Sequence, residues 1–181
     1  MAGFWAHFRG LETPFIRLFI SLLNLTVGLL ILFRKPVIKN GSLKAVLYSL
    51  PSLVCGGLIF KLTKPLEQWS IVSEVLFATG TSVALLSFLM LGRNISVFPG
   101  LRSVVSGGLY KVIRHPSYLG EALMLLGCLF AAVDWVSLLP FLLFFPTIAL
   151  RIIEEERLLL LDDGYQAYQK QVRWRLIPGV W

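Results

Sequence analysis

Apolar residues gather along this chain into five long runs separated by polar stretches. The runs cover residues 15–33, 45–60, 71–91, 119–133 and 135–150. A helix needs about 20 apolar residues to cross a hydrocarbon core of roughly 30 Å. The first and third runs reach that length, and the second reaches it with Lys44 at the interface. The last two meet at Asp134 and predict a helical hairpin. The pattern predicts an all-α integral membrane protein with about five transmembrane helices.

Composition supports the membrane interpretation. Hydrophobic residues make up 56% of the 181 positions and charged residues only 15%, against about 45–50% and 25% in soluble domains. These values exclude a disordered chain, a secreted disulfide scaffold and a typical soluble enzyme. They also argue against nucleic-acid binding, because the net charge of +7 lies between apolar runs and not along one basic face.

The distribution of positive charge predicts the orientation. If the connecting segments alternate sides across five spans, one side receives 13 of the 17 Lys and Arg residues and the other receives four. Positive residues mark the cytoplasmic side of a membrane protein. We therefore expect the N-terminus outside, and the C-terminus inside together with the two polar stretches at residues 92–118 and 151–181.

The first polar stretch contains a candidate anion-binding corner. Pro116 is suited to the first position of a helix, because its missing N–H is not needed there. The free amides near Ser117 and Tyr118 would then form an anion site, with Arg114 and His115 adding positive charge beside it. A small molecule bearing a carboxylate would suit this corner. The alternative is a capped helix end whose basic residues bind lipid head groups.

The second polar stretch places Arg151 and Glu155 four residues apart, on one face of a helix. Either Arg151 extends to the interface, or it faces inward beside the carboxylate. The three consecutive glutamates at 154–156 point about 100° apart and cannot all face one pocket. Cys55 and Cys128 lie inside apolar runs and are expected to act as small hydrophobic residues, so no metal site is predicted.

Several of these residues together resemble one known family. They are Tyr110 after a glycine pair, the run RHPSY at 114–118 followed by Gly120, Arg151 four residues before Glu155, the tyrosines at 165 and 168, and Pro178. This set resembles the isoprenylcysteine carboxyl methyltransferase family, which belongs with the membrane phospholipid methyltransferases. The resemblance covers residues 92–178, about half of the chain.

The resemblance implies a single membrane methyltransferase domain over residues 1–181. Residues 1–91 would supply three transmembrane helices, and residues 92–181 a cofactor-binding catalytic part at the cytoplasmic face. The implied cofactor is S-adenosylmethionine (SAM), with no metal. Arg151 is implied to meet the substrate carboxylate, and both Arg151 and Glu155 are implied to be catalytic. The positions implied to contact the cofactor are Arg102, Ser103, Val104, Val105, Tyr110, His115, Pro116, Ser117, Tyr118 and Glu155.

Three activities fit this resemblance. The main hypothesis is O-methylation of the carboxylate of an isoprenylcysteine-like acceptor with a lipid tail. The first alternative is N-methylation of a phosphatidylethanolamine-type lipid. It needs a general base because an ammonium must lose its proton before it reacts, and Glu154 or Glu156 is the candidate for that base. The second is an NADPH-dependent membrane reductase. Glu121, one turn into the fourth predicted helix, is a further candidate beside the pocket.

Overall fold

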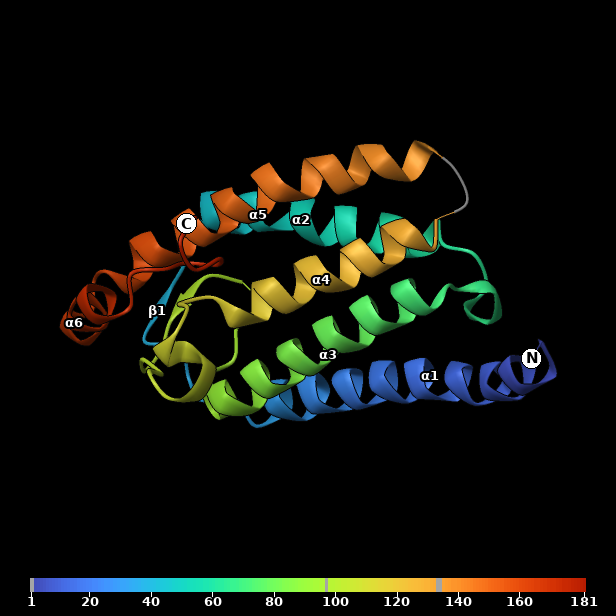
Figure 1. Ribbon diagram of the computed structural model, residues 1–181. Helices are drawn as coiled ribbons and strands as arrows, with labels where there is room; N and C mark the ends of the chain where they lie inside the picture. The colour runs from blue at the N-terminus through green and yellow to red at the C-terminus, as the bar shows by residue number, and fades with distance from the viewer. Residues whose placement is uncertain (1, 97, 133–134) are drawn as a thin grey trace.

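The computed structural model describes residues 2–96, 98–132 and 135–181, with side chains described from residue 15 onward. Six α-helices account for most of this part of the chain (Figure 1). Their bounds are α1 Ala2–Leu32, α2 Leu43–Lys61, α3 Ile71–Leu91, α4 Pro116–Phe130, α5 Leu138–Leu159 and α6 Asp163–Gln171. Four short 3₁₀ turns complete the helical content, at Leu66–Gln68, Gly92–Asn94, Gly108–Lys111 and Trp135–Ser137.

The described structure confirms an all-helical, multi-pass integral membrane protein. α1, α2, α3 and α5 each contain a segment long and apolar enough to cross a membrane, and α4 is a shorter apolar helix of 15 residues. α4 begins at Pro116, because the fixed backbone of proline suits the first position of a helix. Both ends of the helix therefore lie three residues earlier in the chain than the ends of the apolar run at 119–133. Asp134, expected at the tip of the hairpin, lies outside the described residues.

The arrangement of the last two apolar helices is more than a simple hairpin. α4 and α5 follow one another in the chain and run in opposite directions (Figure 1). Each nevertheless packs mainly against a different partner, α4 against α3 and α5 against α2. The sequence predicts the antiparallel pair, whereas the choice of partners depends on the shapes of the helix surfaces.

Glycines bring α3 and α4 into backbone contact. A Cβ atom added at Gly80 would lie 2.6 Å from the Gly120 carbonyl oxygen, and one at Gly120 would lie 2.6 Å from the Ala84 nitrogen. Gly127, two turns further along α4, meets the Ser73 carbonyl oxygen in the same way at 2.8 Å. Small residues at helix interfaces allow this approach in membrane proteins. The contact fixes the position of the α4 side chains that follow Pro116.

The two polar stretches meet at one end of the helix bundle. Figure 1 shows α6, β1 and the C-terminus at the end opposite to the N-terminus. There β1 (Lys39–Asn40), in the loop between α1 and α2, pairs antiparallel with β2 (Gly100–Leu101) in the loop after α3. The C-terminal segment runs beside the start of α4, with Arg114 N donating to Trp174 O at 2.9 Å. The prediction that residues 92–118 and 151–181 share one face is confirmed.

Candidate functional site

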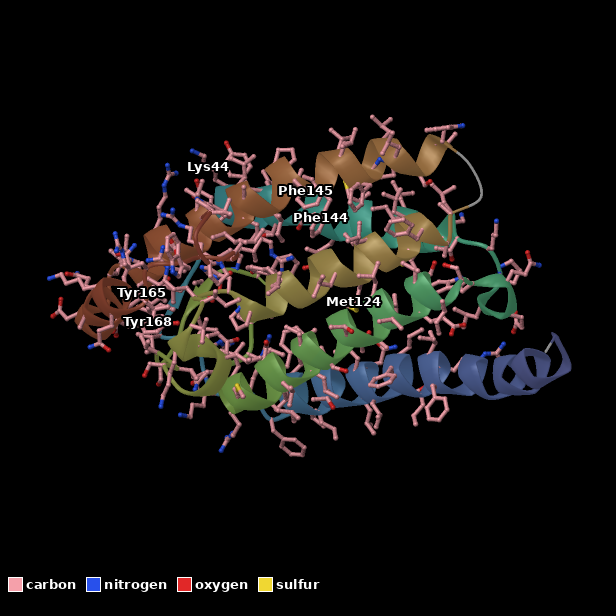
Figure 2. The ribbon with its side chains drawn as sticks, viewed as in Figure 1. Lys44, Met124, Phe144, Phe145, Tyr165 and Tyr168 are labelled. Atoms are coloured by element: carbon pink, nitrogen blue, oxygen red, sulfur yellow. The ribbon has the colours of Figure 1, made fainter. Side chains whose placement is uncertain are left out.

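A cavity of about 340 Å³ lies between the helices at the polar end of the bundle. Figure 2 shows its α6 residues Tyr165 and Tyr168 at that end, and its α4 residue Met124 nearer the middle of the bundle. The cavity therefore extends from the polar end into the membrane part. Its lining residues come from all six helices and from the loop after α3, and α1 and α2 contribute Val27 and Leu53.

α5 supplies the candidate pair, because this helix continues nine residues beyond the last apolar run. Arg151 and Glu155 both line the cavity, as their four-residue spacing predicts. The Arg151 guanidinium is buried, lies 4.9 Å from the centre of the Tyr118 ring and donates to Ser52 Oγ at 3.4 Å. Tyr118 in turn donates a short hydrogen bond from its hydroxyl to Glu155 Oε2. Arg151 thus faces inward and does not extend to the interface.

The loop between α3 and α4 forms one wall of the cavity. Arg102, Ser103, Val104 and Val105 all line it, as the resemblance implies. Arg102 is 4% exposed and is held by the Lys35 carbonyl, which accepts a hydrogen bond from Nη1. Its Nε is buried without a hydrogen-bond partner among the described residues. A buried donor without a partner is costly, so this atom is suited to bind an acceptor on a ligand.

Tyrosines close the polar end of the cavity. Tyr110 lies in the 3₁₀ turn after Gly108, whose φ of 59° belongs to the left-handed region that glycine tolerates best. The Tyr168 hydroxyl donates to the Tyr110 carbonyl oxygen at 2.7 Å. Burial, and then the negative charge of Glu155, raise the pKa of the Tyr110 phenol. It therefore remains a neutral hydroxyl.

Of the four predicted cofactor-contacting residues at the start of α4, two line the cavity and two lie outside its lining. Ser117 and Tyr118 line the cavity, whereas His115 and Pro116 are not among its lining residues. The His115 ring stacks on Tyr118 at 5.6 Å between centres, and its Nε2 lies 3.2 Å from Glu156 Oε1. In this structure His115 supports the residue that lines the cavity.

The three consecutive glutamates have three different surroundings. Glu155 faces the cavity, and Glu154, whose side chain is 11% exposed, pairs with the exposed Arg157. Glu156 is buried and holds together an ion cluster that the sequence analysis missed. Its carboxylate accepts from Arg175 Nε at 2.8 Å and Tyr165 Oη at 3.2 Å, lies 2.9 Å from Arg114 Nε, and meets His115 as described. The excess of Arg in both polar stretches was the available signal for such a partner.

Two further polar residues line the cavity although they were not among the predicted catalytic or cofactor-binding residues. Asn94 lines it, with an Oδ1 atom that is buried and has no hydrogen-bond partner among the described residues. Glu121, the neighbouring candidate, also lines it and lies 4.0 Å from Arg151 Nη1. Over the described residues no group of His, Cys, Asp and Glu is arranged to hold a metal ion.

The fold and the cavity define a membrane-embedded helical bundle with a site at one end that is lined by both polar and apolar side chains. Comparison with known families then identifies its type. The chain belongs to the phospholipid methyltransferase family, whose model matches residues 69–163, just over half of the chain. The isoprenylcysteine carboxyl methyltransferases are a related branch of the same superfamily. No curated protein matches the chain.

Family membership establishes a membrane methyltransferase that acts on a lipid substrate, and the family uses SAM. The match therefore argues against the reductase alternative. It starts at the beginning of α3 and ends at the start of α6, so it includes the helices that carry Tyr118, Glu121, Arg151 and Glu155.

The cavity residues fit SAM by their chemistry. SAM carries an ammonium, a carboxylate, ribose hydroxyls and an adenine ring. Glu155 offers a carboxylate to an ammonium or to hydroxyls, and the free Nε of Arg102 offers a donor to a carboxylate. The free Oδ1 of Asn94 offers an acceptor to an amino group, and Tyr110 and Tyr118 provide aromatic surface.

Proposed function

We propose that this protein N-methylates the amino head group of a phosphatidylethanolamine-type phospholipid, with SAM as the methyl donor. Family membership supports a lipid acceptor, and the name of the family favours a phospholipid over an isoprenylcysteine. The observation that carries the proposal is the second carboxylate of the cavity. Glu121 remains available to an amine in addition to Glu155, which accepts the Tyr118 hydroxyl.

The roles of the chain's residues follow from their positions. SAM supplies a methyl group on a sulfonium, whose carbon–sulfur bond breaks with its electron pair left on sulfur as the methyl carbon bonds to nitrogen. Glu155, Arg102, Tyr110 and Tyr118 hold the donor, and Ser103, Val104, Val105 and Ser117 complete that wall. Since such a displacement depends on alignment, the rigid contact between α3 and α4 orients the two reactants.

The membrane setting matches a substrate that has both a polar head and acyl chains. The lining of the cavity includes the apolar residues Val27, Leu53, Phe88 and Met124, which suit hydrocarbon. The lining also includes polar residues of the loop after α3 and of α6. We propose that this polar end faces the cytoplasm, where SAM is made, as the uneven distribution of Lys and Arg indicates.

A second activity has one specific observation in its favour. Arg151 is buried in the wall of the cavity, and a guanidinium can hold a carboxylate through paired hydrogen bonds. That arrangement suits O-methylation of an isoprenylcysteine, in which the nucleophile is already ionised and needs no base.

One assay separates the two activities. The purified protein is placed in phosphatidylcholine nanodiscs with methyl-labelled SAM and receives either phosphatidylethanolamine or N-acetyl-S-farnesylcysteine. We expect label in mono- and dimethylated phosphatidylethanolamine, detected by mass spectrometry of the extracted lipid. Label only in the farnesylcysteine ester would establish the second activity, and label in neither, with SAM bound, would refute both.

A further inference from the structure

Glu121 lies on α4 near the polar end of the helix bundle. It is five residues after Pro116 on α4, which places it about 7.5 Å along the helix from its polar end. Its side chain is 23% exposed, and it lines the cavity. A carboxylate at this level can meet a lipid head group while the acyl chains remain among the apolar helices.

The contacts of Glu121 leave its oxygens available. Its Oε2 lies 4.0 Å from Arg151 Nη1, which is close enough for charge attraction and too long for a hydrogen bond. Within the part of the chain that the structure describes, no hydrogen bond to its carboxylate is formed. On the α2 side it faces Gly56, where even an added Cβ atom would remain 3.9 Å from Oε1. Glu155, by contrast, accepts the hydroxyl of Tyr118.

The cavity around Glu121 contains other polar and charged groups, and one of them has a buried atom that can bind a ligand. Arg102, nine-tenths buried or more, presents an Nε without a described partner to the same cavity. The charged and titratable groups that share the cavity with Glu121 are Arg102, Tyr110, Arg114, Tyr118, Arg151, Glu155, Tyr165 and Tyr168. Among them only Glu155 is a second carboxylate.

The chemistry of the acceptor gives the pair Glu121 and Arg151 a purpose. A phosphatidylethanolamine head group carries a phosphate and, two carbons away, an ammonium. A guanidinium binds phosphate well, and a carboxylate beside it meets the ammonium. We infer that Arg151 holds the lipid phosphate and that Glu121 accepts the proton that the ammonium must lose. This inference rests on the proposed function.

The proton transfer balances without any other reactant. One N–H bond of the ammonium breaks, its electron pair stays on nitrogen as the nucleophilic lone pair, and the proton moves to an oxygen of Glu121. The charge of Glu121 changes from −1 to 0 and that of the head-group nitrogen from +1 to 0. When the methylated product leaves, the proton passes from Glu121 to water.

The pH dependence of turnover tests the role of Glu121 as base. In Glu121→Gln we expect kcat at pH 7 to fall about 10²-fold, the lower range for a general base. It should then rise about tenfold per pH unit up to pH 9, because only the lipid amine that is already deprotonated reacts. Glu121→Asp should recover part of the activity. The matched control Glu154→Gln, on a glutamate outside the cavity that pairs with the exposed Arg157, should keep the wild-type profile.

Lipid binding in the absence of SAM gives an independent readout. Phosphatidylethanolamine and phosphatidylglycerol share the phosphate and differ in the amine, so native mass spectrometry of lipid adducts compares them directly. We expect wild type to prefer phosphatidylethanolamine, and Glu121→Gln to lose that preference while it still binds both lipids. Arg151→Gln should weaken binding of both.

The possible results separate this inference from the proposed function. If wild type methylates phosphatidylethanolamine and Glu121→Gln has an unchanged pH profile, or a loss that is equal at every pH, Glu121 is not the base. An unchanged lipid preference in Glu121→Gln would likewise overturn its contact with the amine. If wild type does not methylate the lipid at all, the proposed function itself fails.

Discussion

The buried carboxylate of Glu156 offers the sharpest test of how the C-terminal segment is held. Its side chain is 4% exposed and contacts Arg114 at 2.9 Å and Arg175 at 2.8 Å. Removal of one partner from a buried ion pair costs about 3–5 kcal/mol, because the remaining charge stays buried without compensation. The Arg114 side chain is also 4% exposed. Glu156→Gln is therefore expected to lower the free energy of unfolding by about 3–5 kcal/mol.

The measurement is the free energy of unfolding in mixed micelles, followed by circular dichroism during titration with sodium dodecyl sulfate. Glu154→Gln is the matched control, since it makes the same chemical change two residues away. Its own side chain is 11% exposed, but its partner Arg157 is 62% exposed. The Arg157 charge therefore stays in contact with water when the pair is broken, and the loss is expected to be about 0–1 kcal/mol, as for a surface pair. We expect the two variants to differ by at least about 2 kcal/mol.

The cluster also has a local consequence. It joins the start of α4 to the C-terminal segment, where His115 N donates to Arg175 O at 2.9 Å. In Glu156→Gln we therefore expect faster hydrogen exchange at the amides of Arg114 and His115, with α3 unchanged. If Glu156→Gln lost less than 1 kcal/mol and exchanged like Glu154→Gln, the cluster would not be a source of stability.

Three further expectations follow from the same structure. Gly120→Ala places a Cβ atom against the α3 backbone and should lower both the melting temperature and the affinity for SAM. Gly57→Ala, on a helix face with nothing within 4 Å, should change neither. Equilibrium binding of labelled SAM should weaken at least tenfold in Glu155→Gln and persist in Arg151→Gln, which stops turnover. Burial, and then the charge of Glu156, raise the pKa of Tyr168 to about 12. A raised phenol pKa stabilises the fold fully below the unfolded value of about 10 and no longer does so above about 12. As the pH rises between these two values, the melting temperature of Tyr168→Phe should therefore fall less than that of wild type. An equal fall in the melting temperatures of the two proteins would refute the raised pKa of Tyr168.

The site was predictable where one helix carries the signal. Arg151 and Glu155 lie four residues apart on α5, and helical periodicity alone places them on one face. Ser117 and Tyr118 follow Pro116 by one and two residues, so their position at the start of α4 was also local information. The role of His115 could not be predicted from the local sequence, because the direction of its ring depends on Glu156, 41 residues further along the chain.

The sequence by itself determined the class of this protein. Long apolar runs must form membrane-spanning helices, because no water in the bilayer can satisfy an exposed backbone. The same runs place the polar stretches at one end. The tertiary structure decided which residues share the cavity. α4 packs on α3 through Gly80 and Gly120, and this contact places Glu121 4.0 Å from Arg151. Such contacts between distant segments depend on the fit of side-chain shapes, which no local pattern records.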